Sequence, residues 1–100
     1  MPGYRLTRAA ADDVVAIFGE GLEQFGLAQA NRYHEGLAAT FSFLAQYSRA
    51  AREREEIRDP VRIYPYRAHV IVYELGPGDE VLILRVRHGR EDWLAELEAG

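Results

Sequence analysis

The chain has 100 residues, of which 48% are hydrophobic, and its formal net charge at pH 7 is −4. This size fits one domain over residues 1–100 with one hydrophobic core, and the apolar content excludes a disordered chain. The chain has no cysteine, which excludes a disulfide framework and a thiol nucleophile. No apolar run approaches the roughly 18 residues that span a bilayer, and the first residues lack a signal-peptide core, so we expect a cytoplasmic protein.

The chain has 12 arginines and no lysine. The absence of lysine excludes lysine-based chemistry such as a Schiff base or a phosphate-loop lysine. Two interpretations remain open. A GC-rich genome favours arginine codons, and planar guanidinium groups suit recognition of carboxylates or phosphates. The acidic balance of the whole chain argues against direct sequence-specific DNA binding by this chain alone. Five of the arginines nevertheless lie between residues 62 and 90.

Residues Tyr4–Leu6 are expected to form a short strand, and Thr7 is suited to cap a helix that follows it. Apolar residues then recur at three- and four-residue spacing, which predicts a helix with one apolar face. Gly26 is placed to end this helix. The predicted apolar face consists of Ala10, Val14, Ile17, Phe18, Leu22 and Phe25.

A second helix is predicted after Gly26, and the short link makes the two helices an antiparallel hairpin. Its core-facing residues are expected to be Ala30, Tyr33, Leu37, Phe41 and Leu44. A second apolar flank carries Gly36, Thr40, Phe43 and Tyr47, so the apolar face is wider than a simple surface helix needs. Either this helix lies between two surfaces, or part of the face contacts a partner.

The polar stretch from Ser48 to Pro60 has two possible interpretations. Charge pairs at helical spacing would allow it to extend the second helix, and its polarity would equally suit a charged loop. Pro60 ends any helix at this point.

After Pro60 the apolar period changes from 3.6 to 2, which predicts strands over Val61–Tyr66, His69–Leu75 and Val81–His88. The middle strand is apolar on both faces and is therefore expected to be central. Gly76-Pro77-Gly78-Asp79 has the order of residues that a type II turn prefers. Strict alternation along the last strand places Leu82, Leu84 and Val86 toward the helices and Arg85 and Arg87 on the opposite, open face.

The predicted fold class is therefore α+β. A short N-terminal strand is followed by an antiparallel helical hairpin and a three-stranded antiparallel meander, with the helices packed on one face of the sheet. Residues 91–100 form an acidic C-terminal tail.

At this point the sequence resembles the RelE/ParE superfamily of bacterial toxins, and within it the ParE branch. The resemblance covers about residues 4 to 93. Its most specific part is the block Ile83-Leu84-Arg85-Val86-Arg87-His88-Gly89-Arg90 with Asp92-Trp93. The opening Tyr4-Arg5-Leu6-Thr7, the pattern Gly26, Ala28, Ala30, Tyr33 and the segment from Arg62 to Tyr73 also fit. The residues 48–59 depart from the family, which usually has a proline- and glycine-bearing loop there.

The resemblance implies the toxin of a type II toxin–antitoxin module, neutralised by a ParD-like antitoxin. Toxins of this branch inhibit DNA gyrase and block replication by binding, without catalytic turnover. RelE relatives share the scaffold and instead cut mRNA on the ribosome, so fold alone does not choose between the two activities.

A ribonuclease would need groups for proton transfer, phosphate charge and base stacking. The set that we would assign to such catalysis is Arg67, Arg85 and His88, with His69, Arg62 and Arg87 as further candidates. Tyr64, Tyr66 and Tyr73 are candidates for stacking or proton transfer. Alternation points His88 toward the helices, away from Arg85 and Arg87, which weakens this interpretation.

Under the preferred interpretation no residue is catalytic and no cofactor is required. The residues expected to bind the antitoxin are Phe43, Tyr47, Arg62, Arg85 and Arg87. Candidates for contact with the target are Arg85, His88, Arg90 and Trp93. The three histidines lack the close spacing of a metal site, so no metal is expected. A third possibility is a protein-interaction module without toxicity.

Overall fold

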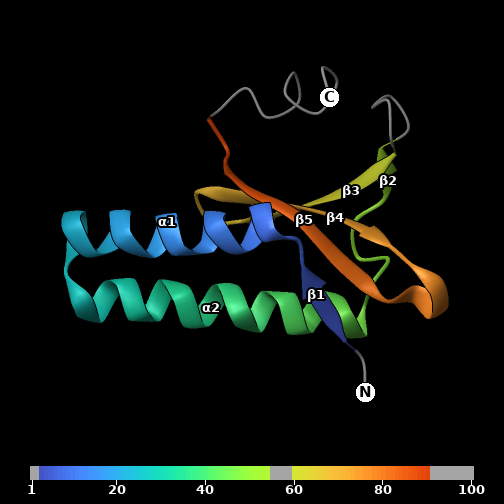
Figure 1. The fold of residues 1–100 in the computed structure, drawn as a ribbon, viewed down its shortest axis with the longest axis horizontal. Coiled ribbons are helices and arrows are strands. Elements are labelled where there is room, and N and C mark those ends of the chain that lie inside the picture. Colours follow the sequence, from blue (N-terminus) through green and yellow to red (C-terminus); the bar gives the residue numbers. More distant parts are fainter. Residues whose placement is uncertain (1–2, 55–59, 91–100) are drawn as a thin grey trace.

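The computed structural model describes residues 3–54 and 60–90, which form one five-stranded sheet and a helical hairpin (Figure 1). The strand order is β1-β5-β4-β3-β2, with β1 parallel to β5 and the other neighbours antiparallel. The strands are β1 (Tyr4–Leu6), β2 (Glu53–Arg54), β3 (Val61–Tyr66), β4 (His69–Leu75) and β5 (Val81–His88). The predicted α+β class and the predicted bounds of β1, β3, β4 and β5 are confirmed.

The two helices are α1 (Arg8–Phe25) and α2 (Leu27–Gln46), and they run antiparallel (Figure 1). Thr7 caps α1 as predicted, because its hydroxyl accepts a hydrogen bond of 3.0 Å from the N–H of Ala10. Gly26 separates the helices with a φ of 88°, a conformation that glycine adopts without steric cost. A single residue can therefore end one helix and begin the next.

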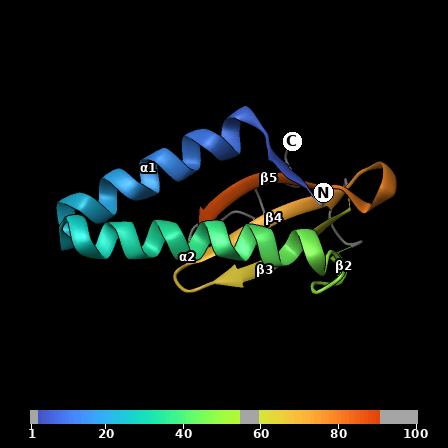
Figure 2. The same ribbon diagram turned by 90° about the horizontal axis from the view of Figure 1, so that it is seen from below.

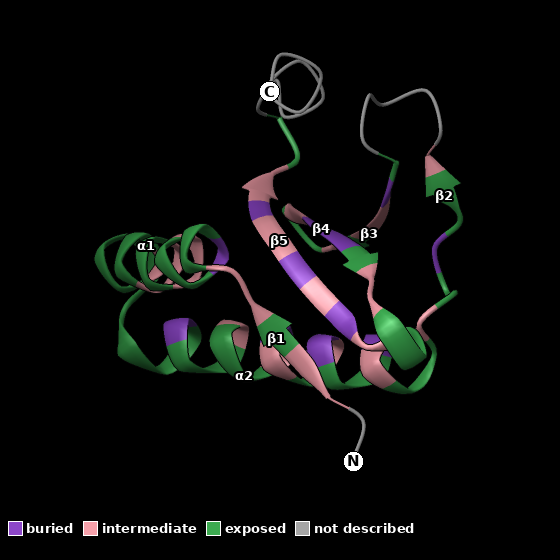
Figure 3. Ribbon diagram, turned by 45° about the vertical axis from the view of Figure 1, so that its right-hand side comes forward, coloured by how far each residue is buried: buried purple, intermediate pink, exposed green. Residues whose placement is uncertain are grey.

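The main core lies between the helices and one face of the sheet. Helix α2 lies across that face, and α1 extends beside it at the β5 edge (Figure 2). Ala10 of α1 and the buried residues of α2 meet buried residues of β4 and β5. Figure 3 marks the buried positions of these elements in purple. This core comprises Ala10, Leu37, Phe41, Leu44, Ala51, Ile71, Tyr73, Val81, Ile83 and Val86.

The assignment of the two faces of β5 corrects the sequence prediction. Val81 and Ile83 face the helices, whereas Leu84 packs against Val72 and Val61 on the other side of the sheet. The reason is a register shift between β4 and β5, where Tyr73 pairs with Ile83 but Val72 pairs with Arg85. An extra residue of this kind reverses the alternation beyond it. Val86 therefore faces the helices as predicted, while Leu82 and Leu84 do not.

The outer half of α1 also differs from the prediction. Leu22 and Phe25 belong to the predicted apolar face, yet they are 42% and 59% exposed. The helices extend beyond the end of the sheet, so the last two turns of α1 contact α2 without a third layer beneath them (Figure 1). The apolar pattern of α1 thus continues past the part of the core that could bury it.

The stretch after α2 is not a continuation of that helix. Helix α2 ends at Gln46, and Arg49 forms a 3.0 Å ion pair with Asp79 of the β4–β5 turn. Glu53 and Arg54 form β2, a strand that the sequence did not predict, along the outer edge of β3. Residues 55–59 of this connector lie outside the described residues.

Tyr73 explains why the chain turns after α2. Its side chain is completely buried, its hydroxyl donates a hydrogen bond of 2.8 Å to the carbonyl of Ser48, and it accepts a longer one from the N–H of Ala51. Burial raises the pKa of the Tyr73 hydroxyl above its ordinary value, so the group stays protonated at neutral pH. Tyr73 therefore fastens the connector to the sheet and cannot stack on a nucleobase.

The β4–β5 turn has the glycine conformation that its sequence suggested. Gly78 has a φ of 68°, and the N–H of Asp79 donates a hydrogen bond of 3.1 Å to the carbonyl of Gly76. Positive φ at the third residue is what a type II turn requires. Within residues 3–54 and 60–90, neither helix is long and apolar enough to cross a membrane.

Candidate functional site

The first candidate surface is an arginine cluster, consisting of Asp13 of α1 with Arg85 and Arg87 of β5. The strand register places both arginines opposite valines on the sheet face away from the helices, as predicted. Arg85 then reaches around the β5 edge and binds the Asp13 carboxylate in bidentate fashion, with Nε at 2.8 Å and Nη2 at 3.0 Å. Arg87 Nη1 lies 4.0 Å from the same carboxylate. Parallel N–H···O bonds of this kind are among the strongest in proteins.

The charge state of Asp13 follows from these contacts. Burial alone raises the pKa of the carboxyl. The hydrogen bonds from Arg85 and from the backbone N–H of Val86, together with the two guanidinium charges, outweigh this effect and hold its pKa below the ordinary value of 3.8. Asp13 is therefore ionised at neutral pH and completes an ion pair with Arg85. The sequence suggested an antitoxin as the partner of Arg85, and it did not single out Asp13 for this contact.

His88 and Arg90 lie at the end of β5. The ring of His88 packs against the ring of His69 with centroids 5.3 Å apart, on the helix side of the sheet, where alternation placed it. Its Nδ1 accepts a hydrogen bond of 3.1 Å from the N–H of Arg90. Trp93 and the rest of the tail, residues 91–100, lie outside the described residues.

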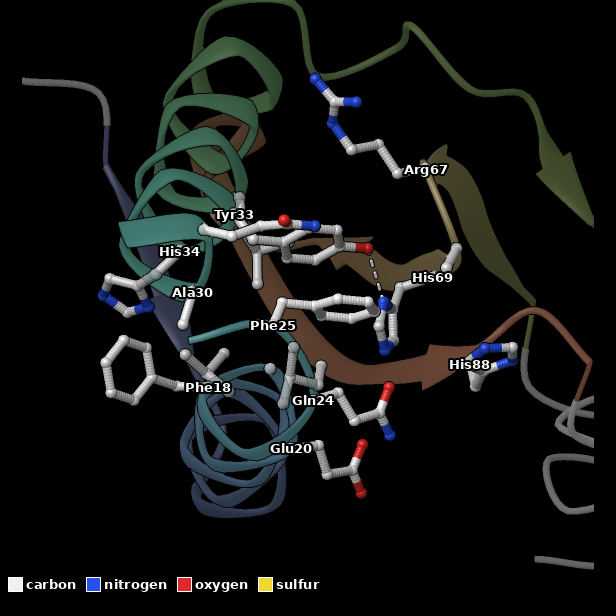
Figure 4. A pocket seen from close by; sticks show the side chains of 16 residues that line it. Phe18, Glu20, Gln24, Phe25, Ala30, Tyr33, His34, Arg67, His69 and His88 are labelled. Carbon is white, nitrogen blue, oxygen red and sulfur yellow. Dashed lines mark hydrogen bonds between the residues drawn. The ribbon is translucent and has the colours of Figure 1, made fainter. Parts of the chain in front are cut away.

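The second candidate surface is a cavity of about 340 Å³ between the outer halves of the helices and the ends of β4 and β5 (Figure 4). Its walls are largely apolar, with Phe18 and Phe25 from α1 and Ala30 from α2. Polar side chains gather at one end, where Tyr33 and His69 point toward one another in Figure 4. Their Oη and Nδ1 atoms lie 2.7 Å apart.

Tyr33 is the central polar group of this cavity. Burial raises the pKa of its hydroxyl above 10.0, so it is protonated at neutral pH. Its ring also meets the edge of Tyr66, with centroids 5.1 Å apart. Arg67 lies beside them in the β3–β4 turn with a φ of 52°. Tyr33 was expected in the core because of its spacing, and no sequence signal placed it next to His69.

The structure does not bring the three residues of the ribonuclease hypothesis onto one surface. Arg67 and His88 both line the cavity, on the helix side. Arg85 lies on the other face of β5 and is bound to Asp13. A base, an acid and a phosphate-binding cation must converge on one reacting group, so this set cannot act together in the described arrangement.

The third candidate surface is an aromatic patch, consisting of Phe43 in the last turn of α2, Tyr47 directly after that helix, and Tyr64 on β3. Phe43 is 39% exposed and Tyr47 is 59% exposed. The ring centroids lie 5.1 Å apart for Phe43 and Tyr47, and 5.7 Å apart for Phe43 and Tyr64. The second flank of α2 thus ends in exposed rings that no described element covers.

Arg62 lies near this patch without belonging to it. Its register partner is Tyr73, so it is on the helix side of β3, and its Nη1 donates a hydrogen bond of 2.6 Å to the carbonyl of Ala51. Arg62 thereby helps Tyr73 to hold the connector after α2. Among residues 3–54 and 60–90, the acidic and histidine side chains form no cluster of three that could hold a metal ion.

Comparison with known proteins shows which family this chain is similar to. A family model described as the ParE toxin of the type II toxin-antitoxin system parDE matches residues 4–93. Toxin ParE3 of Caulobacter vibrioides is 28% identical over 91 residues, which cover 91% of this chain and 90% of the relative. Toxin ParE1 of the same organism is 32% identical over 88 residues, which cover 88% of this chain and 90% of the relative.

The fold is similar to a solved structure as well. A chain described as the chromosomal ParDE TA system from P. aeruginosa matches with a TM-score of 0.74 and 23% identity. The match covers 88% of this chain and 96% of that one. At this identity the likeness supports the fold.

Proposed function

The chain belongs to the ParE toxin family of type II toxin–antitoxin systems, and from this premise we propose that it inhibits DNA gyrase and is neutralised by a ParD-like antitoxin. The observation that carries the proposal is the family match, which extends over residues 4–93 and so includes both the hairpin and β5. The toxin acts in the cytoplasm, by binding and without catalytic turnover. This view is supported by the separation of Arg85 from Arg67 and His88 across the two faces of β5.

The antitoxin is the first partner in this proposal. An acidic, partly disordered antitoxin segment that folds on binding needs an apolar surface to bury and cations to pair with its carboxylates. The aromatic patch offers the apolar surface through Phe43 and Tyr47. Arg62, Arg85 and Arg87 are the proposed charged contacts, although Arg62 and Arg85 also have the intramolecular partners described above.

We assign the target contacts to the end of β5, with Arg85 on the outer face of the strand and His88 on the helix side. Arg85, His88 and Arg90 lie along six residues of this strand and the turn that follows it, and Trp93 comes three residues later in the sequence. Exposed arginine and aromatic side chains are the residue types that contribute most to protein–protein interfaces. Inhibition by binding requires a protein–protein interface of this kind and does not require a set of catalytic residues.

Induction of the chain alone in bacterial cells tests the proposed function. Gyrase inhibition predicts filamentation and a DNA-damage response while protein synthesis continues. Co-expression of the neighbouring antitoxin gene, which we expect to encode a small ribbon-helix-helix protein, should restore growth. A rapid fall in protein synthesis would instead indicate mRNA cleavage, and unchanged growth would indicate an interaction module without toxicity.

A further inference from the structure

The outer edge of β5 is paired with a strand over only part of its length. Strand β1 covers Val81, Ile83 and the residue between them, and β5 continues for five residues beyond this pairing. A strand edge without a neighbour presents backbone N–H and C=O groups that need other partners. In this protein the residues that follow β1 in the sequence supply those partners.

Thr7 and Asp13 extend the hydrogen bonding along this edge. The N–H of Thr7 donates to the carbonyl of Ile83 at 3.0 Å, and the Thr7 hydroxyl donates to the carbonyl of Leu84 at 2.8 Å. One turn and a half into α1, the Asp13 carboxylate accepts a hydrogen bond of 2.9 Å from the N–H of Val86. A side chain of α1 thus occupies the place that a longer β1 would have filled.

The same carboxylate also fixes the side chain of Arg85. Oδ2 accepts from both Val86 N–H and Arg85 Nε, and Oδ1 accepts from Arg85 Nη2. The Asp13 side chain is only 13% exposed, so water competes weakly for these bonds. A free arginine side chain samples many rotamers, and a partner must otherwise supply the free energy that orders it. A guanidinium held by two of its five N–H donors is ordered before any partner arrives.

We propose that Asp13 is the positioning residue of the arginine cluster: its carboxylate aligns the end of β5 and orients Arg85 for contact with acidic groups of the target. The inference rests on the proposed function, because it concerns how the target surface is prepared. Asp13 acts through Arg85 and the β5 backbone, and it makes no target contact itself in this account.

Three variants separate geometry from charge. Asp13→Asn keeps the shape of the side chain and one oxygen acceptor but removes the charge. Asp13→Glu keeps the charge and adds one methylene, which moves the carboxylate off the site that Val86 and Arg85 share. Asp12→Asn is the matched control, because Asp12 is the exposed neighbour in the same helix and its loss changes the net charge as Asp13→Asn does.

Two measurements are made on each variant and on the unchanged protein. Amide hydrogen exchange at Val86 and Arg87, with Ile71 as the internal reference, reports how firmly the end of β5 is held. The inducer dose that halves the growth rate reports toxicity. We expect exchange at Val86 to rise by at least about tenfold in Asp13→Asn and Asp13→Glu, since a charge-assisted hydrogen bond is weakened. Exchange at Ile71 should stay unchanged, and the toxic dose should rise for both variants but not for Asp12→Asn.

The result for Asp13→Glu decides the inference even if Asp13→Asn folds poorly, because the net charge of Asp13→Glu equals that of the unchanged protein. Unchanged Val86 exchange in Asp13→Glu would overturn the positioning role. So would a raised exchange rate combined with a toxic dose equal to that of Asp12→Asn. If the unchanged protein itself does not inhibit growth, the proposed function fails instead, which distinguishes the two failures.

Discussion

At the scale of the residue, Asp13 links distant parts of the sequence through one carboxylate. It lies more than seventy positions before Arg85 and Val86, and it joins the first helix to the last strand. Its contacts explain why an arginine that looked available for a partner is already ordered in the isolated chain. Its lowered pKa also makes the stability of the fold depend on pH.

The sign of this pH dependence follows from linkage. The pKa of Asp13 is lower in the folded state than in the unfolded chain, so the folded state binds fewer protons to this group. Its contribution to stability is therefore complete above about pH 5 and is lost as the pH falls through the folded pKa. Urea midpoints measured from pH 7 down to pH 3 should decrease less steeply in Asp13→Asn than in the unchanged protein. Parallel curves for the two proteins would contradict this assignment.

Gly36 shows a second effect at this scale, because it makes room for an aromatic ring. A Cβ atom at this position would overlap the hydroxyl of Tyr66, whereas a Cβ at Gly19 would meet no atom within 4 Å. Replacing an exposed helical glycine by alanine stabilises a helix by about 1 kcal/mol. Gly19→Ala should therefore raise the free energy of unfolding by about that amount.

Gly36→Ala should have the opposite sign despite the same gain in helix propensity. The ring of Tyr66 would have to move away from position 36, and overpacking of this kind costs about 1–3 kcal/mol. Urea unfolding of both variants measures the difference. Equal stabilisation by the two substitutions would show that Tyr66 moves aside without cost.

At the scale of the element, α2 has two apolar flanks that differ in how far they are buried. One flank is buried against the sheet through Leu37, Phe41 and Leu44. The other carries Gly36 beneath Tyr66 and then ends in the exposed rings of Phe43 and Tyr47. The excess apolar width that the sequence showed is thus partly internal packing and partly open surface.

Because these rings are exposed, the double variant Phe43→Ala/Tyr47→Ala should affect antitoxin binding more than it affects the stability of the fold. We expect its antitoxin affinity to fall by at least about tenfold, because exposed aromatic side chains that become buried in an interface contribute strongly to binding. Its urea midpoint should change little by comparison. The affinity is measured by isothermal titration with the cognate antitoxin.

Val15→Ala is the control for this double variant, since Val15 is 72% exposed on α1 and lies outside the aromatic patch. It should leave antitoxin affinity unchanged. If the double variant binds the antitoxin as tightly as the control does, the aromatic patch is not the antitoxin surface.

At the scale of the whole molecule, the three candidate surfaces occupy different regions of one small fold. The aromatic patch lies where α2 ends, the cavity lies where the hairpin passes the end of the sheet, and the arginine cluster lies at the β5 edge. Most of the elements that carry them were predictable. Apolar periodicity predicted both helices and the strands β1, β3, β4 and β5, because alternation and helical spacing are local properties of a sequence.

The sequence by itself therefore determined the class of the fold, the order of its elements, the Thr7 cap and the resemblance to the ParE toxins. Tertiary structure alone decided which side chains of β5 face the helices, because one extra residue at Leu84 shifts a register that local periodicity cannot reveal. It also decided the partners of the functional side chains. Arg85 meets Asp13, and Tyr33 meets His69, only because packing brings distant segments together, and the geometry of such contacts is set by the whole fold.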